Sequence, residues 1–459
     1  MKKLLSFAAA MSPLALAAAV PVVSCVSMTQ DARRRVAIEY DLSGPAVVTA
    51  DVQTNAPGGA WVSITAEVGA ANFVGDVWKR VDSAHGVIRW NPVESWPDVK
   101  LAGGAGIRAV VTAWAPDDTP DYMVVDLAAD SACRTNYYPS VDLLPGGLFG
   151  NDAYRTTKLV MRKVVAKDVP WTMGSTCEPH SLNTSNYNLG VVPDQKQAHP
   201  VTLTNNYYLA VFETTHAQWR AITGSLPALN GTYRFDTDGD MRPCESVYPS
   251  GVRGSMNWPS APSSGSFLGR LRTRTGIDFD YPSEAQWEFA CRAGSVDGEW
   301  NDGTRFEFTT LWNAQFILAA SSTQTLHTAV SADARGRYAV NGGYIASDSA
   351  SGSPFTAPSV PTCGLANGTV AAGTVYPPNA WGFYDMHGNV AEICLDHYAQ
   401  DIIAQNGGVQ AEGSKIVVRG GGWRSTSAFE MLSSTRMGID DNMYQYHIGF
   451  RLACRAGLR

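Results

Sequence analysis

Residues Pro378–Glu392 read PNAWGFYDMHGNVAE and form the most informative segment of the chain. Gly388 suits a tight turn or a close approach of two backbones, because glycine has no Cβ atom. Trp381 is expected in the core or in a pocket wall, as are Trp287 and Trp423 elsewhere, because large aromatic side chains dominate such places. The 43 glycines, 25 prolines and 13 tryptophans of the chain indicate a loop-rich fold rather than a helical bundle.

The composition is that of a folded protein with more than one domain. The 459 residues are 45% hydrophobic and 17% charged, which excludes a disordered or fibrous chain. This length favours two or three domains. The net charge of −7 argues against nucleic acid as the main partner, because phosphate binding needs a basic surface. Phosphate-binding loops, nucleophile elbows and C-x-x-C motifs are absent from the sequence.

The N-terminus is predicted to direct export. Lys2 and Lys3 precede an apolar run, and the segment 1–25 is expected to be a signal peptide. The residues before Cys25 resemble a bacterial lipobox, which makes Cys25 a candidate for lipidation; ordinary cleavage near Ala17–Ala19 and an uncleaved anchor are the alternatives. The protein is therefore expected in the cell envelope as a lipoprotein, or secreted. We expect contact with the membrane only through the lipid anchor, because no second apolar span follows.

Two domains and a connector are predicted. Residues 30–130 contain short alternating segments such as Ala46–Val52, which favour an all-β immunoglobulin-like sandwich. Residues 131–157 are expected to be a connector, and a new pattern begins at residue 158 and continues to 459. Within that second domain, Thr215 and Ser283 have the sequence signature of residues that cap amphipathic helices.

The second domain resembles the sulfatase-modifying-factor family, whose best-known members are the formylglycine-generating enzymes. The resemblance implies an α+β, C-type-lectin-like fold that is irregular and loop-rich. The matching blocks follow one another in the family order; they are 169–175, 199–203, 208–215, 281–294, 378–392, 418–423 and 448–452.

The resemblance also implies a calcium site and a disulfide. The family holds calcium with oxygen atoms of the segment that contains Asn389 and Glu392, and Asn313 matches a second calcium segment; oxygen ligands suit this hard cation. A hydrogen-bonded turn without an ion is the alternative. The family often links the cysteine of the 281–294 block to the end of the Gly-Phe-Arg strand, which implies a Cys291–Cys454 disulfide, with Cys454 two residues beyond the usual place.

The copper site of the formylglycine-generating enzymes is missing. Those enzymes bind Cu(I) with a pair of cysteines a few positions after the glycine-rich block, because soft thiolates suit this ion. Here the chain has no cysteine between Cys394 and Cys454. We therefore expect no copper and no oxidase activity of that type, and we identify no catalytic residue. Iron-dependent relatives carry a histidine-rich helical domain, whereas this chain has only His85 before residue 170.

The segment 423–447 is the expected ligand face, because its small, polar and aromatic residues resemble an adaptable binding surface. An ordinary irregular surface loop is the alternative. We expect an exported binding or scaffold protein with a protein or glycan ligand; a secreted metal-dependent enzyme of the same superfamily and an assembly role are the other hypotheses. The candidate ligand-binding residues are Trp381, Trp423, Arg424, Ser425, Phe429, Tyr444 and Tyr446.

Overall fold

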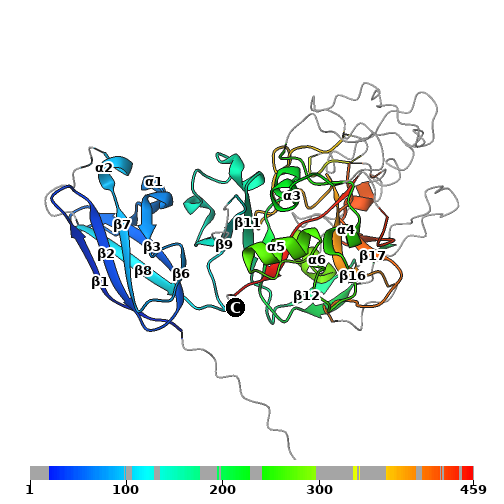
Figure 1. Cartoon of the computed structure of the whole chain (residues 1–459), viewed down its shortest axis with the longest axis horizontal. Coiled ribbons are helices and arrows are strands. Elements are labelled where there is room, and N and C mark those ends of the chain that lie inside the picture. Colours follow the sequence, from blue (N-terminus) through cyan, green and yellow to red (C-terminus); the bar gives the residue numbers. More distant parts are fainter. Residues whose placement is uncertain are drawn as a thin grey trace, which may run out of the picture. The chain divides into compact units, whose positions relative to one another are not determined.

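The computed structural model describes residues 20–97, 99, 106–128, 135–175, 194–195, 198–227, 240–295, 334–338, 341, 368–399, 406–423, 425, 428–443 and 447–457. The chain divides into two compact units (Figure 1). The first unit comprises residues 1–64 and 72–116, and the second comprises residues 65–71 and 117–459. Among the described residues there is no helix with the length and apolar character that a membrane crossing requires.

The first unit consists of antiparallel strands in two sheets. One sheet has the order β1 (Val23–Gln30), β2 (Val36–Leu42), β7 (His85–Trp90) and β5 (Phe73–Gly75). In the other, β3 (Ala46–Asn55) pairs with β4 (Val62–Ser63), β6 (Lys79–Val81) and β8 (Gly106–Trp114). The short helix α2 (Pro92–Ser95) also belongs to this unit, whereas α1 (Thr65–Val68) lies in residues 65–71, which belong to the second unit.

The alternation of buried and exposed residues explains the sandwich. In β2, Val36, Ile38, Tyr40 and Leu42 are buried while their neighbours are more exposed. Successive side chains of a strand point to opposite faces, so this pattern covers one face of the sheet with apolar groups. The predicted all-β sandwich is confirmed.

The boundaries of the predicted domains differ from those of the structure. Residues Tyr122–Asp126, which we placed in the sandwich, form β9 of the second unit, and the first unit ends at Pro116. The predicted connector 131–157 contains a strand, β10 (Thr135–Tyr138), that pairs with β9. The physical reason is that residues 122–125 are all buried, as expected of a central strand covered on both faces rather than an alternating sandwich strand. The sandwich also begins earlier than residue 30, with β1.

The second unit is an α+β fold, as predicted, and its described residues form three sheets. One sheet has the order β10, β9, β11 (Lys158–Val164), β15 (Tyr207–Ala210) and β20 (Ala453–Arg455). Another has the order β13 (Asp194–Gln195), β18 (Thr435–Ile439), β17 (Ile416–Arg419), β16 (Ala391–His397) and β19 (Ile448–Gly449). A two-stranded sheet pairs β12 (Pro170–Met173) with β14 (His199–Thr202). The longer helices are α3 (His216–Thr223), α4 (Pro249–Arg253), α5 (Phe267–Thr275) and α6 (Glu284–Arg292).

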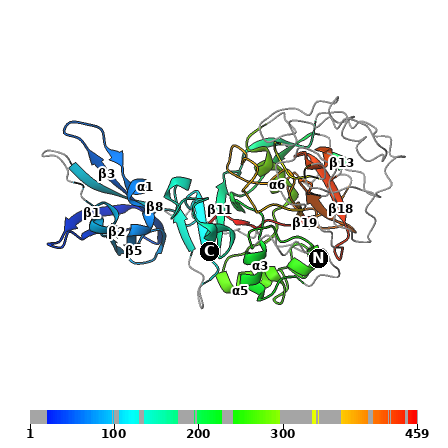
Figure 2. The same cartoon turned by 90° about the horizontal axis from the view of Figure 1, so that it is seen from above.

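The two predicted helix caps are confirmed. Thr215 before α3 and Ser283 before α6 each accept a hydrogen bond from the backbone three residues later, and a glutamine there bonds back to the cap. This reciprocal arrangement satisfies backbone N–H groups that a helix start otherwise leaves without partners. Helix α3 then packs on α5, where the rings of Trp219 and Phe267 stack 4.8 Å apart (Figure 2).

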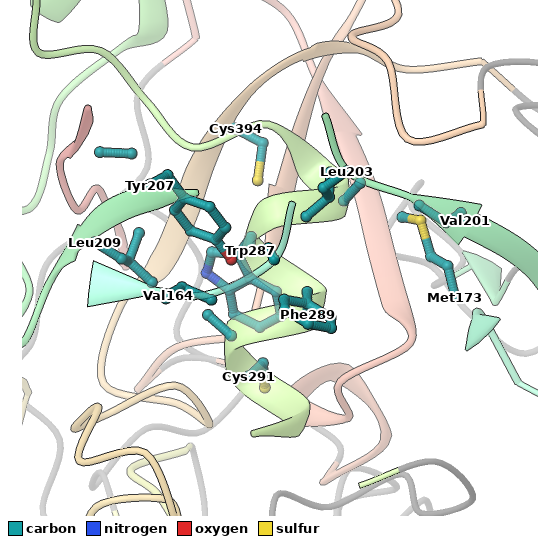
Figure 3. Packing of buried hydrophobic residues seen from close by; sticks show 14 of the residues in the cluster. Val164, Met173, Val201, Leu203, Tyr207, Leu209, Trp287, Phe289, Cys291 and Cys394 are labelled. Atoms are coloured by element: carbon teal, nitrogen blue, oxygen red, sulfur yellow. The ribbon is translucent and has the colours of Figure 1, made fainter. Parts of the chain in front are cut away.

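The core of the second unit surrounds α6. Trp287 is fully buried, and Figure 3 shows it among Tyr207, Leu209 and Val164 from the neighbouring strands. Phe289 on the same helix lies 5.2 Å from the ring of Trp171. Because α6 is covered by strands that are far apart in sequence, its polar residues are also buried, and they form one of the two buried networks described below.

Candidate functional site

Glu392 is the centre of a buried hydrogen-bond network on β16. Arg451 donates from Nε to Glu392 Oε2 at 2.7 Å and from Nη2 to Oε1 at 2.5 Å. The indole Nε1 of Trp287 donates to Glu392 Oε2 at 2.7 Å. All three side chains are buried. Both carboxylate oxygens of Glu392 are therefore engaged by donors of the protein itself.

Asn389 links the same segment to Glu213, three residues after the end of β15. Its Nδ2 donates to Glu213 Oε2 at 2.6 Å, and its Oδ1 accepts from the backbone of Val370 at 2.9 Å. The backbone N–H of Val390 donates to Glu213 Oε1 at 3.0 Å. Asn389 has φ of +69°, a left-handed conformation that asparagine tolerates better than most residues.

The predicted calcium ligands do not fit a cation in this arrangement. Glu392 has both oxygens bound to Arg451, and the Asn389 carbonyl oxygen accepts a backbone hydrogen bond. A calcium ion needs several oxygen ligands that are free of such donors. No group of three or more histidine, cysteine, aspartate or glutamate side chains suitable for a metal occurs in the described part of the chain. Asn313 lies outside the described residues. Calcium stays a prediction of the family resemblance only, because in the structure these side chains form the hydrogen-bonded turn that was the alternative.

Two further buried carboxyl groups lie close to this network. Burial raises the pKa of Glu213 well above its usual range, and the charges of Asp385 and Glu392 raise it further. Burial also raises the pKa of Asp385 to about 6, although a hydrogen bond from the Gly373 backbone acts against the shift. Oδ1 of Asp385 has no hydrogen-bond partner among the described residues. Three carboxyl groups thus share the neighbourhood of Arg451, and a proton on one of them relieves the repulsion.

Sequence reasoning missed Glu213 and Asp385. Both lie in blocks that match the family, Glu213 in residues 208–215 and Asp385 in residues 378–392. The available signal was the position of each acid directly after an apolar or aromatic run, where a charge is costly unless it has a partner. The sequence does not reveal the partner, because Glu213 and Asn389 are 176 positions apart.

A second buried network holds α6 against β17 and β18. Arg436 donates from Nε and Nη2 to the two carboxylate oxygens of Glu284, both at 2.6 Å. Arg419 bonds to Glu288, and so does Arg292, one helical turn away on α6, at 2.8 Å. Burial alone would raise the pKa of Glu288, but the charges of Arg292 and Arg419 outweigh it, so the pKa is lower than usual.

The predicted Cys291–Cys454 disulfide is not formed. Both are buried free thiols. The Cys291 sulfur lies 3.8 Å from Nε2 of His387 and 3.9 Å from the carbonyl oxygen of Met386, whereas Cys454 is on β20 opposite Tyr208. The prediction was wrong because α6 directs Cys291 toward the 386–388 turn rather than toward β20.

The described part of the expected ligand face is mostly interior. Trp423 is 7% exposed and Ser425 is 1% exposed, so neither can offer much surface to a ligand. Trp423 donates its backbone N–H to the Asn389 carbonyl at 2.9 Å, and Ser425 Oγ accepts from the Gly422 backbone at 3.0 Å. Their assignment as contact residues was wrong, because the glycine-rich block continues directly into the core.

The other predicted ligand residues have different outcomes. Trp381 is half-buried, packs on Phe289 with ring centroids 5.2 Å apart, and accepts a hydrogen bond from Arg162 at its carbonyl. Arg424, Tyr444 and Tyr446 lie outside the described residues, as does the side chain of Phe429.

The candidate lipidation site lies within a strand. Cys25 is exposed in β1, at the point where the pairing with β2 changes register. Its φ of +52° belongs to this irregularity. Lipidation of Cys25 stays a prediction.

Comparison with known proteins identifies the second domain. The family model described as "Sulfatase-modifying factor enzyme 1-like domain" matches residues 181–456, more than half of the 459-residue chain. No curated protein matches the chain. Among solved structures, the chain is similar to Treponema denticola variable protein 1, with 21% identity, a TM-score of 0.41 and coverage of 65% of this chain and 96% of that chain. It is also similar to PvdO from Pseudomonas aeruginosa, with 22% identity, a TM-score of 0.41 and coverage of 64% and 94%.

Proposed function

The chain belongs to the family of sulfatase-modifying factor enzyme 1-like domains, and from this premise we propose that it is an exported binding or scaffold protein without copper-dependent oxidase activity. The observation that carries the proposal is the absence of any cysteine between Cys394 and Cys454. The resemblance places the thiolate pair for Cu(I) in that interval. Serine and threonine hydroxyls, which this segment has instead, are poor ligands for a soft ion.

The thiols elsewhere in the described part of this unit do not replace the missing pair. Cys291 faces the imidazole of His387, whereas the Cys394 thiol lies 3.9 Å from the carbonyl oxygen of Glu392. Burial raises the pKa of both thiols. A buried neutral thiol is inert, because the thiolate is the form that binds metal and reacts. The proposal that oxidase activity is absent is supported by these surroundings.

A binding role is supported by how the polar residues are used. The buried carboxyl and guanidinium groups around α6 and β16 bond to one another, so they act as a framework rather than as groups open to a substrate. The sandwich unit contributes no candidate catalytic residue and suits a spacer or contact role. The ligand is a protein or a glycan. The protein is located in the cell envelope, with Cys25 as the lipid attachment point.

A second candidate function is a secreted metal-dependent enzyme of the same superfamily. The observation that favours it is the pair Glu213 and Asp385, because carboxyl groups with raised pKa values gather at functional sites. Glu213 is 0% and Asp385 3% exposed, which leaves a substrate no direct route to either. The binding role is therefore the better supported of the two.

The test uses the full chain carrying Cys25→Ser, which removes the candidate lipid attachment and keeps β1 whole. The protein is incubated with copper and a cysteine-containing sulfatase peptide, and the peptide is followed by mass spectrometry. The metal content of the same sample is measured. We expect no conversion of cysteine to formylglycine and no bound copper, while an active formylglycine-generating enzyme converts the peptide in parallel. Conversion by this protein would refute the proposal.

A further inference from the structure

We propose that Tyr248 and the turn Asp440–Met443 form a docking surface for a protein segment that carries lysine or arginine beside an apolar side chain. The inference rests on the proposed binding function and specifies where and what the protein binds. The docking surface contains the exposed turn in the described part of the expected ligand face, residues 423–447.

The exposed part of that segment is the turn after β18. From Met431 to Arg436 every residue is at most 1% exposed, and Ile439 at the end of β18 is buried. Residues 440–443 are all exposed, and a hydrogen bond of 3.0 Å from the Met443 backbone to the Asp440 carbonyl closes the turn. In the described part of 423–447, the turn is thus the place where a partner can make contact.

The turn is fixed beside α4. The Asp441 carbonyl accepts two hydrogen bonds from Ser250, one from its backbone N–H at 3.0 Å and one from its hydroxyl at 2.8 Å. Ser250 is in the first turn of α4, two residues after Tyr248. This double contact joins segments that are 191 positions apart, so the turn and Tyr248 belong to one surface.

Tyr248 is held in place by the helix that follows it. A Cβ atom built on Gly251 would lie 2.7 Å from Cε2 of the Tyr248 ring, which means that the ring rests directly on the glycine backbone. The side chain is nevertheless 42% exposed. A tyrosine that is already fixed loses little conformational entropy when a partner covers it, and tyrosine and methionine are enriched at protein interfaces. Met443, 39% exposed, supplies further apolar area on the turn.

The charge of the surface selects the partner. Asp440 and Asp441 are exposed, and neither forms an ion pair with another described residue. The cation nearest in sequence to Tyr248, Arg253, is 0% exposed and bonds to Asp280. Two exposed carboxylates that have no ion pair among the described residues, beside an aromatic anchor, complement a basic and apolar protein segment.

The experiment uses the full chain carrying Cys25→Ser and two pools of random peptides of equal length. One pool is built from lysine, arginine, leucine, tyrosine and serine, and the other has aspartate and glutamate in place of the basic residues. Binding is measured by fluorescence anisotropy at low and high salt. We expect binding of the basic pool only, with loss of affinity at high salt because exposed charges are screened.

Three variants test the surface. Tyr248→Ala is expected to weaken binding about tenfold or more, as truncation of a central aromatic anchor does. Gly251→Ala keeps the tyrosine but forces its ring to move, and the same loss is expected. The double variant Asp440→Asn/Asp441→Asn is expected to remove most of the salt dependence. Val165→Ala and Glu412→Gln, which change exposed residues elsewhere in this unit, are matched controls expected to bind like the parent.

The outcomes separate this inference from the proposed function. Equal binding of the two pools, no binding of either, or parent-like binding by Tyr248→Ala would overturn the docking surface. Binding of a neutral oligosaccharide mixture that Tyr248→Ala abolishes would overturn the choice of partner. Formylglycine formation in the oxidase assay would instead overturn the proposed function, whichever pool binds. Unfolding curves of every variant are recorded, so that a folding defect is not taken for lost contact.

Discussion

Replacement of Arg451 by methionine is expected to cost more stability than replacement of its partner Glu392 by glutamine. Arg451 is fully buried and donates to both oxygens of Glu392 and to the carbonyls of Ala210, Val211 and Tyr384. Its charge also lowers the pKa of Glu213 and Asp385. Loss of the guanidinium therefore affects three carboxyl groups at once, whereas loss of the Glu392 charge leaves Arg451 beside the other two.

The magnitudes follow from the burial of the groups. Breaking a buried ion pair by removing one partner costs about 3–5 kcal/mol, and we expect the upper end for Arg451→Met because Glu213 and Asp385 lose their cation too. We expect about 2 kcal/mol for Glu392→Gln, since the amide oxygen can still accept from Trp287 and Arg451. The difference of about 3 kcal/mol is well above the error of a denaturation experiment.

The cost of Arg451→Met should depend on pH. The pKa values of Glu213 and Asp385 are raised by burial, so the folded state binds protons more tightly than the unfolded chain. The ionised carboxyl groups of Glu213 and Asp385 destabilise the folded state. This effect is absent below the ordinary pKa of a carboxyl group, about 4, and is fully present above the folded-state pKa, which is about 6 for Asp385. Without Arg451, Glu213 and Asp385 depend more on protonation to avoid a buried negative charge. We therefore expect Arg451→Met to lower the free energy of unfolding less at about pH 5 than at about pH 7.5.

The assay is urea denaturation followed by tryptophan fluorescence and circular dichroism, because Trp287 donates to Glu392 and reports on this region. Arg80→Met is the control, because Arg80 forms an exposed pair with Asp82 in the first unit and should contribute less than about 1 kcal/mol. The reasoning would be refuted if Arg451→Met and Glu392→Gln lowered the free energy of unfolding equally, or if Arg451→Met lowered it by the same amount at both pH values.

Three further predictions concern the same unit. Burial, with a smaller effect of Glu284, raises the pKa of Asp396 from 3.8 to about 7, so its carboxylate destabilises the fold increasingly as the pH rises between these values. Asp396→Asn should therefore flatten the pH dependence of the free energy of unfolding in this range. An unchanged slope would contradict the raised pKa of Asp396. Gly388 has φ of +90°, and an added Cβ would lie 2.4 Å from the Arg337 carbonyl, so Gly388→Ala should lower the free energy of unfolding by about 3 kcal/mol or more, measured by denaturation. Calcium removal with EGTA should leave the melting temperature unchanged, because both carboxylate oxygens of Glu392 already accept hydrogen bonds from Arg451; a clear decrease would show that calcium binds this fold.

Local features of the fold were predictable because they depend on neighbouring residues. The caps at Thr215 and Ser283 follow from hydroxyl and glutamine side chains three positions apart, and the Glu288–Arg292 pair follows from helical spacing. The alternation in the sandwich strands follows from the geometry of a strand. The boundary at residue 116 was not predictable in this way, because a fully buried strand such as β9 has the same apolar composition in either unit.

The candidate site was predictable only as a set of residue types. Asn389 and Glu392 were recognised from their segment, but their partners Glu213 and Arg451 come from segments that are distant in sequence. Oxygen atoms that could bind a cation therefore accept hydrogen bonds from the protein instead. The same limit applied to Cys291, whose direction depends on how α6 packs against the 386–388 turn.

The sequence alone established the family of the second domain, through the order of its matching blocks. It also established the sandwich before that domain and the absence of a cysteine pair where the family binds copper. Each of these is a property of residue identity and spacing along the chain. Only the tertiary structure decided that Glu392 pairs with Arg451, that Trp423 and Ser425 are interior, and that the exposed turn in the described part of 423–447 lies beside α4, which follows Tyr248. Burial and pairing depend on which distant segments meet, and a carboxylate, a tryptophan or a serine is compatible with several such environments until packing selects one.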